Sequence, residues 1–451
     1  MAVFEKSIQI IPDDPSIYCI QGLFLSTHEK KADYFSFANS SFEKATSLDP
    51  HYFEAWFFWG KLLQQQAEET EDEVLAQQAD QMFLRASQCR PEDPELEANL
   101  YWNWGMVDSL LGRLHGEAVD FNRALKKFAV SASLGASGSE FWEHYGHVVC
   151  ELGSLVNRPE ALIEGCDYFK KAVEADPANG SALLSVAYCN QKLYEITGSF
   201  QYCLLGCEAF EAATPYNDKD SEFWFRWALL LFLSGRQVLD LESIEASFEK
   251  FEKAFECKPD NSLVLTKWAE AEMVYGFYDD RIDLLRKSEA RIIASLKILD
   301  SNAEAWYIYG TCLSEMGRYF FDENYYTQAL EKFQYGLYLS SKDVLILQGI
   351  SQCYYALGEM KNDASMIELS IVYSERAVQV AGSYNHQLYN DWGVSLMKMA
   401  EMTSDKSFLE SAIEKFEIAT AGFDEEDSGN FDPEWLYNYG CALDFLGDFY
   451  E

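Results

Sequence analysis

The sequence predicts an all-α solenoid in which antiparallel helix hairpins stack side by side. Three observations predict this fold class. A small residue followed by a phenylalanine recurs most often at intervals of 41 residues, and a period of about this size is typical of stacked repeats. Within each interval the apolar residues recur every three or four positions, which indicates helices. Very little of the chain alternates apolar and polar residues with period two, so we expect essentially no strand.

The repeat is visible as two ladders of positions. The small residues are Gly22, Gly60, Gly105, Gly146, Ala187, Ala228, Ala269, Gly310, Gly349, Gly393 and Gly440. The positions of the second ladder are Phe42, Phe83, Phe128, Phe169, Phe210, Phe251, Ile292, Phe333, Ser374 and Phe416. Eight of the ten pairs are 23 residues apart. Glycine in a helix interior costs about 0.5–1 kcal/mol, so its repetition indicates that two helices approach too closely for a larger side chain.

Residues 302–341 serve as the model unit. A first helical stripe, helix A, is followed by Gly317 and a polar stretch at 322–324, which we interpret as the turn. A second stripe, helix B, then runs through Ala329 and Phe333. Prolines follow helix B at Pro50, Pro91, Pro177 and Pro259, where they open the next segment. Stops and N-caps between helix A and helix B are predicted at 197–199, 362–363 and 403–405.

We therefore predict one repeat array over residues 1–451. Its predicted units are a partial repeat at 1–14, complete repeats at 15–52, 53–97, 98–138, 139–179, 180–220, 221–261, 262–302, 303–341, 342–385 and 386–432, and a partial repeat at 433–451. Each partial unit lacks one helix, so we expect a longer array or ends that stack on another chain. Acidic extra residues are expected near Glu68–Glu73 in the second unit and at Asp424–Asp427 in the tenth, as solvated loops or helix ends.

The repeated residues resemble the tetratricopeptide repeat family. The matching positions are Trp306, Gly310, Gly317, Ala329 and Phe333 in one unit, Ala38, Phe42, Ala45 and Pro50 in another, and Ala79, Phe83, Ala86 and Pro91 in a third. The resemblance covers the whole chain and implies a right-handed superhelix with an inner groove lined by helix A. The family's usual unit is 34 residues, and most units here have seven more. Seven residues are roughly two helical turns, so we expect each helix to be about one turn longer.

Composition narrows the function. The chain has 35 Lys and Arg against 74 Asp and Glu, a net charge of −39, which argues against nucleic acid and against an anionic membrane surface. Eleven cysteines at irregular spacing without a CxxC pair fit a reducing compartment better than a disulfide framework. The first residues lack a signal pattern and no apolar stretch is long enough to span a bilayer. We expect a cytoplasmic protein.

No strong catalytic signature occurs, so we expect neither an enzyme nor a cofactor. One cluster deserves mention as a metal candidate: Glu143, His147 and Cys150 are spaced four and three apart on one predicted helix face. Carboxylate, imidazole and thiolate are a zinc ligand set. Three ligands on one straight helix rarely close a tetrahedral shell, so ordinary groove or packing residues are the favoured interpretation.

Candidate groove residues lie three positions before and one position after each small residue, whereas the aromatic ladder one position before it is interpreted as core. The candidates are Phe57, Lys61, Trp102, Met106, Glu143, His147, Leu184, Tyr188, Phe225, Leu229, Thr266, Glu270, Tyr307, Thr311, Asn390 and Val394. Members of the family that clamp a terminal carboxylate use several basic residues here. Lys61 is the only basic residue of this set, so that activity is not expected.

Three functions remain open. The leading hypothesis is a non-enzymatic scaffold that binds a peptide or helix of a partner, basic or amphipathic, in an acidic and aromatic groove. The second is a structural segment of a larger assembly, held end to end with possible self-association through uncapped ends. The third is a metal protein or enzyme that uses Glu143, His147 and Cys150.

Overall fold

The computed structural model describes residues 2–27, 32–89, 91, 93–382, 385–421 and 432–448. In these residues every regular element is a helix. The helices are α1 (Ala2–Ile10), α2 (Pro15–Thr27), α3 (Ala32–Leu48), α4 (Phe53–Thr70), α5 (Glu73–Cys89), α6 (Pro94–His115), α7 (Ala118–Ser133), α8 (Ser139–Leu155), α9 (Glu160–Ala175), α10 (Gly180–Thr197), α11 (Phe200–Asn217), α12 (Ser221–Val238), α13 (Leu241–Cys257), α14 (Ser262–Tyr278), α15 (Ile282–Ile298), α16 (Ala303–Phe320), α17 (Glu323–Leu339), α18 (Val344–Lys361), α19 (Ala364–Ala381), α20 (His386–Thr403), α21 (Lys406–Thr420) and α22 (Pro433–Asp448).

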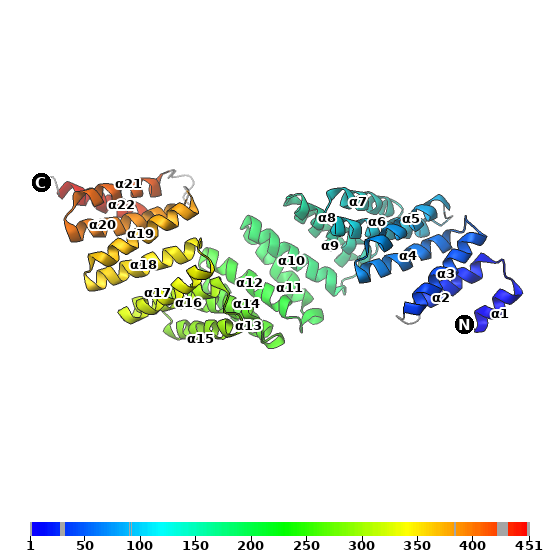
Figure 1. Cartoon of the computed structure of the whole chain (residues 1–451), viewed down its shortest axis with the longest axis horizontal. Helices are drawn as coiled ribbons and strands as arrows, with labels where there is room; N and C mark the ends of the chain where they lie inside the picture. Colours follow the sequence, from blue (N-terminus) through cyan, green and yellow to red (C-terminus); the bar gives the residue numbers. More distant parts are fainter. Residues whose placement is uncertain are drawn as a thin grey trace. The chain divides into compact units, whose positions relative to one another are not determined.

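Figure 1 shows these helices as successive hairpins, in which an even-numbered helix (helix A) pairs with the odd-numbered helix that follows it (helix B). The chain divides into two compact units, residues 1–218 and 219–451. Within each unit, each helix B also packs on the next helix A, so the hairpins stack. The predicted all-α fold of stacked antiparallel hairpins is confirmed, whereas a single continuous array over all 451 residues stays a prediction.

The two sequence ladders meet inside each hairpin. A Cβ atom added to Gly60 would lie 2.7 Å from the ring of Phe83, and one added to Gly310 would lie 2.6 Å from the ring of Phe333. The same contact joins Gly146 to the ring of its own helix B partner, and these phenylalanines are buried. At these glycine positions, a side chain larger than hydrogen would have to displace the ring. The predicted reason for the small residues is therefore confirmed.

One repeat uses a different contact, and here the assignment of Gly349 to the small-residue ladder is wrong. Gly349 packs against Phe333 of the preceding hairpin, 2.6 Å from the ring to an added Cβ. Ser351 instead faces helix B of its own hairpin, where its hydroxyl lies 2.7 Å from the hydroxyl of Ser374. Ser370 joins the same buried group. Paired hydroxyls thus replace the glycine–phenylalanine contact, which explains a serine where the pattern predicts a phenylalanine.

The turn from helix A to helix B is short and repeats the same geometry. A residue with left-handed backbone, φ between 50° and 68°, lies in each turn from α4–α5 to α20–α21: Glu71, Gly116, Asn157, Gly198, Leu239, Asp280, Phe321, Asn362 and Ser404. The predicted N-caps Asp363 and Asp405 accept hydrogen bonds from the amides of Ser365 and Ser407. Gly317, however, is not a turn residue. It lies inside α16, where an added Cβ would be 2.9 Å from Tyr326.

The extra residues of the second predicted repeat (53–97) lie elsewhere than predicted. Glu68–Glu73 is no insertion, because α4 has 18 residues, a common length for helix A here. The additional length is in α6, which has 22 residues and begins one turn early at Pro94. Four residues make about one helical turn. The other predicted extra stretch, Asp424–Asp427, lies outside the described residues.

Candidate functional site

Side chains of helix A line four cavities in the described residues, in volumes of about 920, 270, 390 and 170 Å³. In each compact unit, we call the surface formed by the even-numbered helices the helix-A face. Each cavity includes at least one of the predicted groove positions: Trp102 in the largest, Lys61 beside α2 and α6, Val394 between α18 and α22, and Tyr307 with Thr311 between α16 and α18. That these residues bind a partner stays a prediction.

The predicted groove residues differ in exposure. Phe57, Phe225, Thr266 and Asn390 are 6% exposed or less, so they pack between helices and offer no free surface. Phe225, for example, lies 6.2 Å from the ring of Phe251. Those half-buried or exposed are Lys61, Trp102, Met106, Glu143, His147, Leu184, Tyr188, Leu229, Glu270, Tyr307, Thr311 and Val394.

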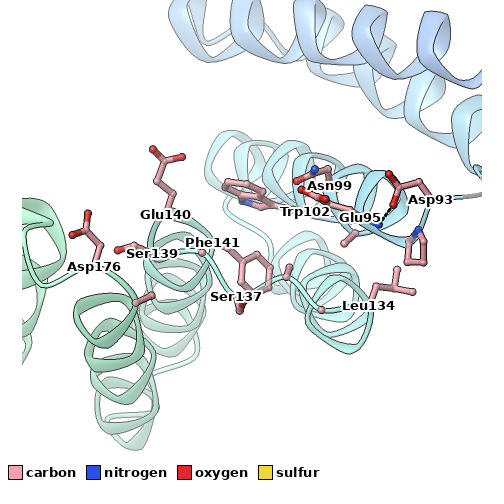
Figure 2. Close-up of a pocket in the computed structure, with 16 residues that line it drawn as sticks. Asp93, Glu95, Asn99, Trp102, Leu134, Ser137, Ser139, Glu140, Phe141 and Asp176 are labelled. Carbon is pink, nitrogen blue, oxygen red and sulfur yellow. Dashed lines mark hydrogen bonds between the residues drawn. The ribbon is translucent and has the colours of Figure 1, made fainter.

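The largest cavity lies where α6 and α8 begin. Its walls are the first turns of α6, the loop 134–138, the start of α8 and the C-terminal end of α9. Figure 2 shows the rings of Trp102 and Phe141 between carboxylates on two sides. Those carboxylates belong to Asp93, Glu95, Glu140 and Asp176. No lysine or arginine occurs among the described residues that line it, so the cavity is acidic with an aromatic floor.

Trp102 forms this floor with its neighbours. Its ring meets Phe141 edge-on, with centroids 6.0 Å apart, and lies 5.9 Å from the ring of His144. Burial lowers the pKa of His144, so the imidazole is neutral at pH 7. The indole Nε1–H of Trp102 is buried and has no hydrogen-bond acceptor among the described residues. The ring of Phe141 and a neutral imidazole therefore hold the Trp102 ring in place.

Glu143 joins two hairpins on the helix-A face. Its carboxylate accepts hydrogen bonds from Asn179 Nδ2 at 3.0 Å and from the hydroxyl of Ser181 at 2.5 Å, both at the start of α10. His147 Nε2 lies 3.8 Å from Glu143 Oε1. The nearby His147 imidazole, together with the hydrogen bonds from Ser181 and Asn179 and against the effect of burial, lowers the pKa of Glu143 to about 2. Glu143 is thus ionised and fully engaged in holding α8 to α10.

The metal candidate does not assemble. Cys150 lies two turns from Glu143, about 10.5 Å along the helix axis. It packs instead against the buried cluster of Cys166 and Cys189. Across the described ranges, no group of three or more His, Cys, Asp or Glu side chains is placed to hold a metal ion.

In the second unit the helix-A face carries a chain of ion pairs. Arg236 contacts Glu270 at 2.8 Å, Lys267 contacts Glu270 at 2.8 Å and also reaches Glu304 of the next hairpin at 2.6 Å. Three helices A are linked in this way. Sequence spacing singled out Glu270 but not its cationic partners. These pairs engage the carboxylates of Glu270 and Glu304 with cations of the same face.

The spacing rule also missed the four carboxylates of the largest cavity. They lie at helix ends, and the rule considered only positions near the middle of helix A. The signal that points to them is the longer interval between Phe83 and Gly105, because the extra turn of α6 supplies Asp93 and Glu95 to the wall.

Within the part of the chain that the structure describes, no helix is both long and apolar enough to cross a membrane.

No family model and no curated protein matches the sequence. The chain is similar in fold to several solved structures. Yeast Tom70 shares 12% identity over 98% of this chain and 90% of its own, with a TM-score of 0.40. A tetratricopeptide repeat protein of Parabacteroides merdae shares 12% identity over 68% and 98%, with a TM-score of 0.45. YrrB, described as a TPR protein with an unusual peptide-binding site, shares 15% identity over 58% and 95%, with a TM-score of 0.31. At these identities and TM-scores the likenesses concern the fold alone.

Proposed function

We propose that the protein is a non-enzymatic scaffold that binds a peptide segment or helix of a partner on its helix-A face. The observation that carries this proposal is that, in each compact unit, helix-A side chains at positions predicted from the repeat line cavities. Stacked repeats act mostly through extended surfaces of this kind. The net charge of −39 favours a basic or amphipathic partner. A cytoplasmic location remains part of this proposal.

The first test uses peptides selected from a random display library on the intact protein. The variant Met106→Lys/Thr311→Lys places a bulky cation on the helix-A face of each unit, at half-buried positions. We expect it to weaken binding of the selected peptides by at least tenfold, since the cation repels a basic ligand and blocks the surface. Calorimetric titration measures the affinity. We also expect the affinity of the unaltered protein to fall with added salt.

A matched control carries the same charge change on helices B. Val119→Lys/Val372→Lys alters residues that are 63% and 52% exposed, and we expect it to leave the affinity within about twofold, as is usual for surface changes away from a contact. Equal losses in both variants would place the binding surface elsewhere. Affinity that is independent of salt would remove the electrostatic part of the proposal.

A second candidate is a structural segment of a larger assembly, and one observation on α22 favours it. A Cβ added to Gly440 would meet no atom within 4 Å among the described residues, whereas the corresponding glycines contact a phenylalanine. Leu436 and Leu443 of the same helix are 42% and 47% exposed. We expect light scattering to show self-association that rises with concentration and weakens in Leu436→Lys/Leu443→Lys. A monomer at every concentration would eliminate this candidate.

A further inference from the structure

We infer that the largest cavity binds an arginine side chain of a partner peptide, with the guanidinium among its four carboxylates and a peptide carbonyl at the start of α8. This inference rests on the proposed function and names the chemistry of the partner. The cavity volume of about 920 Å³ is within the range of sites that hold organic ligands. It exceeds what a single inorganic ion fills.

The extra turn of α6 makes this cavity unlike the others. Other helices A, such as α4 and α8, begin seven residues before their small residue, whereas α6 begins eleven before Gly105. The added turn brings Asp93, Pro94 and Glu95 into the wall that faces the loop 134–138. Figure 2 shows this wall on one side of Trp102, with Glu140 and Asp176 on the other side. A length difference in one repeat has therefore created an additional acidic wall.

The distribution of charge selects an organic cation. The four carboxylates are spread around the cavity, and the described residues contain no three-residue group that could hold a metal ion. A guanidinium has five N–H donors in one plane and therefore can pair with carboxylates from more than one direction. Its flat face also stacks on an indole. Trp102 supplies that ring in the floor of the cavity, so arginine fits the site better than the compact ammonium of lysine.

The backbone at the cavity mouth selects a peptide. The first turn of α8 begins after Gly138, and no side chain caps it. Amide groups of a helix's first turn have no acceptor within the helix, and Ser137 and Ser139 beside them are also part of the lining. A peptide carbonyl oxygen is the acceptor that these amides lack. The site thus combines carboxylate acceptors for a cation with backbone N–H donors for a peptide carbonyl. A polyamine has no carbonyl oxygen and would leave those donors unused.

The test uses an acetylated and amidated pentapeptide in which two arginines alternate with three alanines. Its counterpart has citrulline, which is uncharged and nearly isosteric, in place of arginine. We expect calorimetry to show at least tenfold weaker binding of the citrulline peptide. We expect Glu95→Gln/Glu140→Gln, which changes two exposed lining carboxylates, to weaken binding of the arginine peptide by about three- to tenfold. Hydrogen exchange should show protection of residues 134–141 when that peptide is bound.

The matched control is Glu117→Gln, an exposed residue at the other end of the α6–α7 hairpin whose side chain forms no cap hydrogen bond. It should leave the affinity within about twofold. Equal binding of the citrulline peptide, tighter binding of spermine, or protection only of residues that do not line the cavity (outside 93–102, 134–141 and 175–176) would each overturn the inference. If library-selected peptides still bind the helix-A face in any of these cases, the proposed function stands without it. If neither those peptides nor the arginine peptide binds, the proposed function and this inference are both wrong.

Discussion

Phe333→Ala is expected to destabilise the compact unit 219–451 by about 3–5 kcal/mol, the usual cost of removing a buried phenylalanine ring. Phe333 is 1% exposed and touches two hairpins at once. Its ring packs on Gly310 of its own helix A and on Gly349 of the next. Hydrogen exchange of the intact chain measures the effect as faster exchange of the amides in α16, α17 and α18, because repeat stacks open locally.

A second substitution tests whether the glycine contact is the cause. Gly349→Ala should destabilise the unaltered protein, since the added Cβ would lie 2.6 Å from the ring of Phe333. In the Phe333→Ala background it should be stabilising, because alanine favours the helix by about 1 kcal/mol over glycine and partly fills the cavity. Tyr338→Ala, on the same helix but 82% exposed, is the control and should have little effect. Additive effects of the first two changes would contradict the proposed contact.

Lys127→Leu is expected to destabilise the first unit by about 2–4 kcal/mol. Lys127 Nζ lies 2.5 Å from Asp108 Oδ2, and the side chain of Asp108 is fully buried. Removing one partner of a buried ion pair leaves a charge without compensation, which costs about 3–5 kcal/mol. The second partner of Asp108, Arg123 at 3.1 Å, remains, so the expected loss is smaller. Lys127 also lies over the ring of Trp104 at 3.8 Å, a contact that is lost as well.

The pH dependence of the loss should identify the buried carboxylate of Asp108 as its origin. Burial, against the attraction of Lys127 and Arg123, already raises the pKa of Asp108, and removal of Lys127 raises it further. A carboxyl group whose pKa is higher in the folded state stabilises the fold below its unfolded pKa, and this stabilisation is lost as the pH rises through the folded pKa. The deficit of Lys127→Leu, relative to the unaltered protein, should therefore be smallest near pH 4 and grow toward pH 7 in urea unfolding.

Two further variants separate the charge from the packing. Asp108→Asn in the Lys127→Leu background removes the buried charge at almost constant volume and should recover part of the stability at pH 7. Lys126→Leu changes the neighbouring exposed lysine and should have little effect. A deficit that does not vary with pH, or that Asp108→Asn does not reduce, would assign the loss to packing alone.

The fold could be predicted from the sequence because the same contact between helix A and helix B recurs in most repeats. Gly60 with Phe83 and Gly310 with Phe333 are 23 residues apart, and this spacing reflects two helices in direct contact. The assignment of the small residue failed in the repeat where hydrogen-bonded hydroxyl groups replace the packing of a ring on glycine. Ser351 and Ser374 form the equivalent contact through hydroxyl groups, so a search for glycine and phenylalanine selected Gly349 instead.

The candidate site was harder to predict, for a reason of position. Trp102 lies three residues before Gly105, as the spacing requires, but Asp93 and Asp176 lie at the ends of helices in different hairpins. Positions of this kind come together only through the stacking of hairpins, which the spacing within one repeat does not contain. Phe225 shows the opposite error. It satisfies the spacing but is 6% exposed, because a register rule does not distinguish a surface from the seam between two helices.

The two ends of each hairpin differ in how much change they tolerate. At the turn from helix A to helix B, the left-handed residue follows the small position by eleven residues whether it is Glu71, Leu239 or Phe321. At the opposite end, lengths vary, and the added turn of α6 is the case that the structure describes most fully. New ligand specificities can therefore be introduced at the variable end by insertion, while the invariant end keeps the hairpins in register. The architecture separates the part that diversifies from the part that maintains the stack.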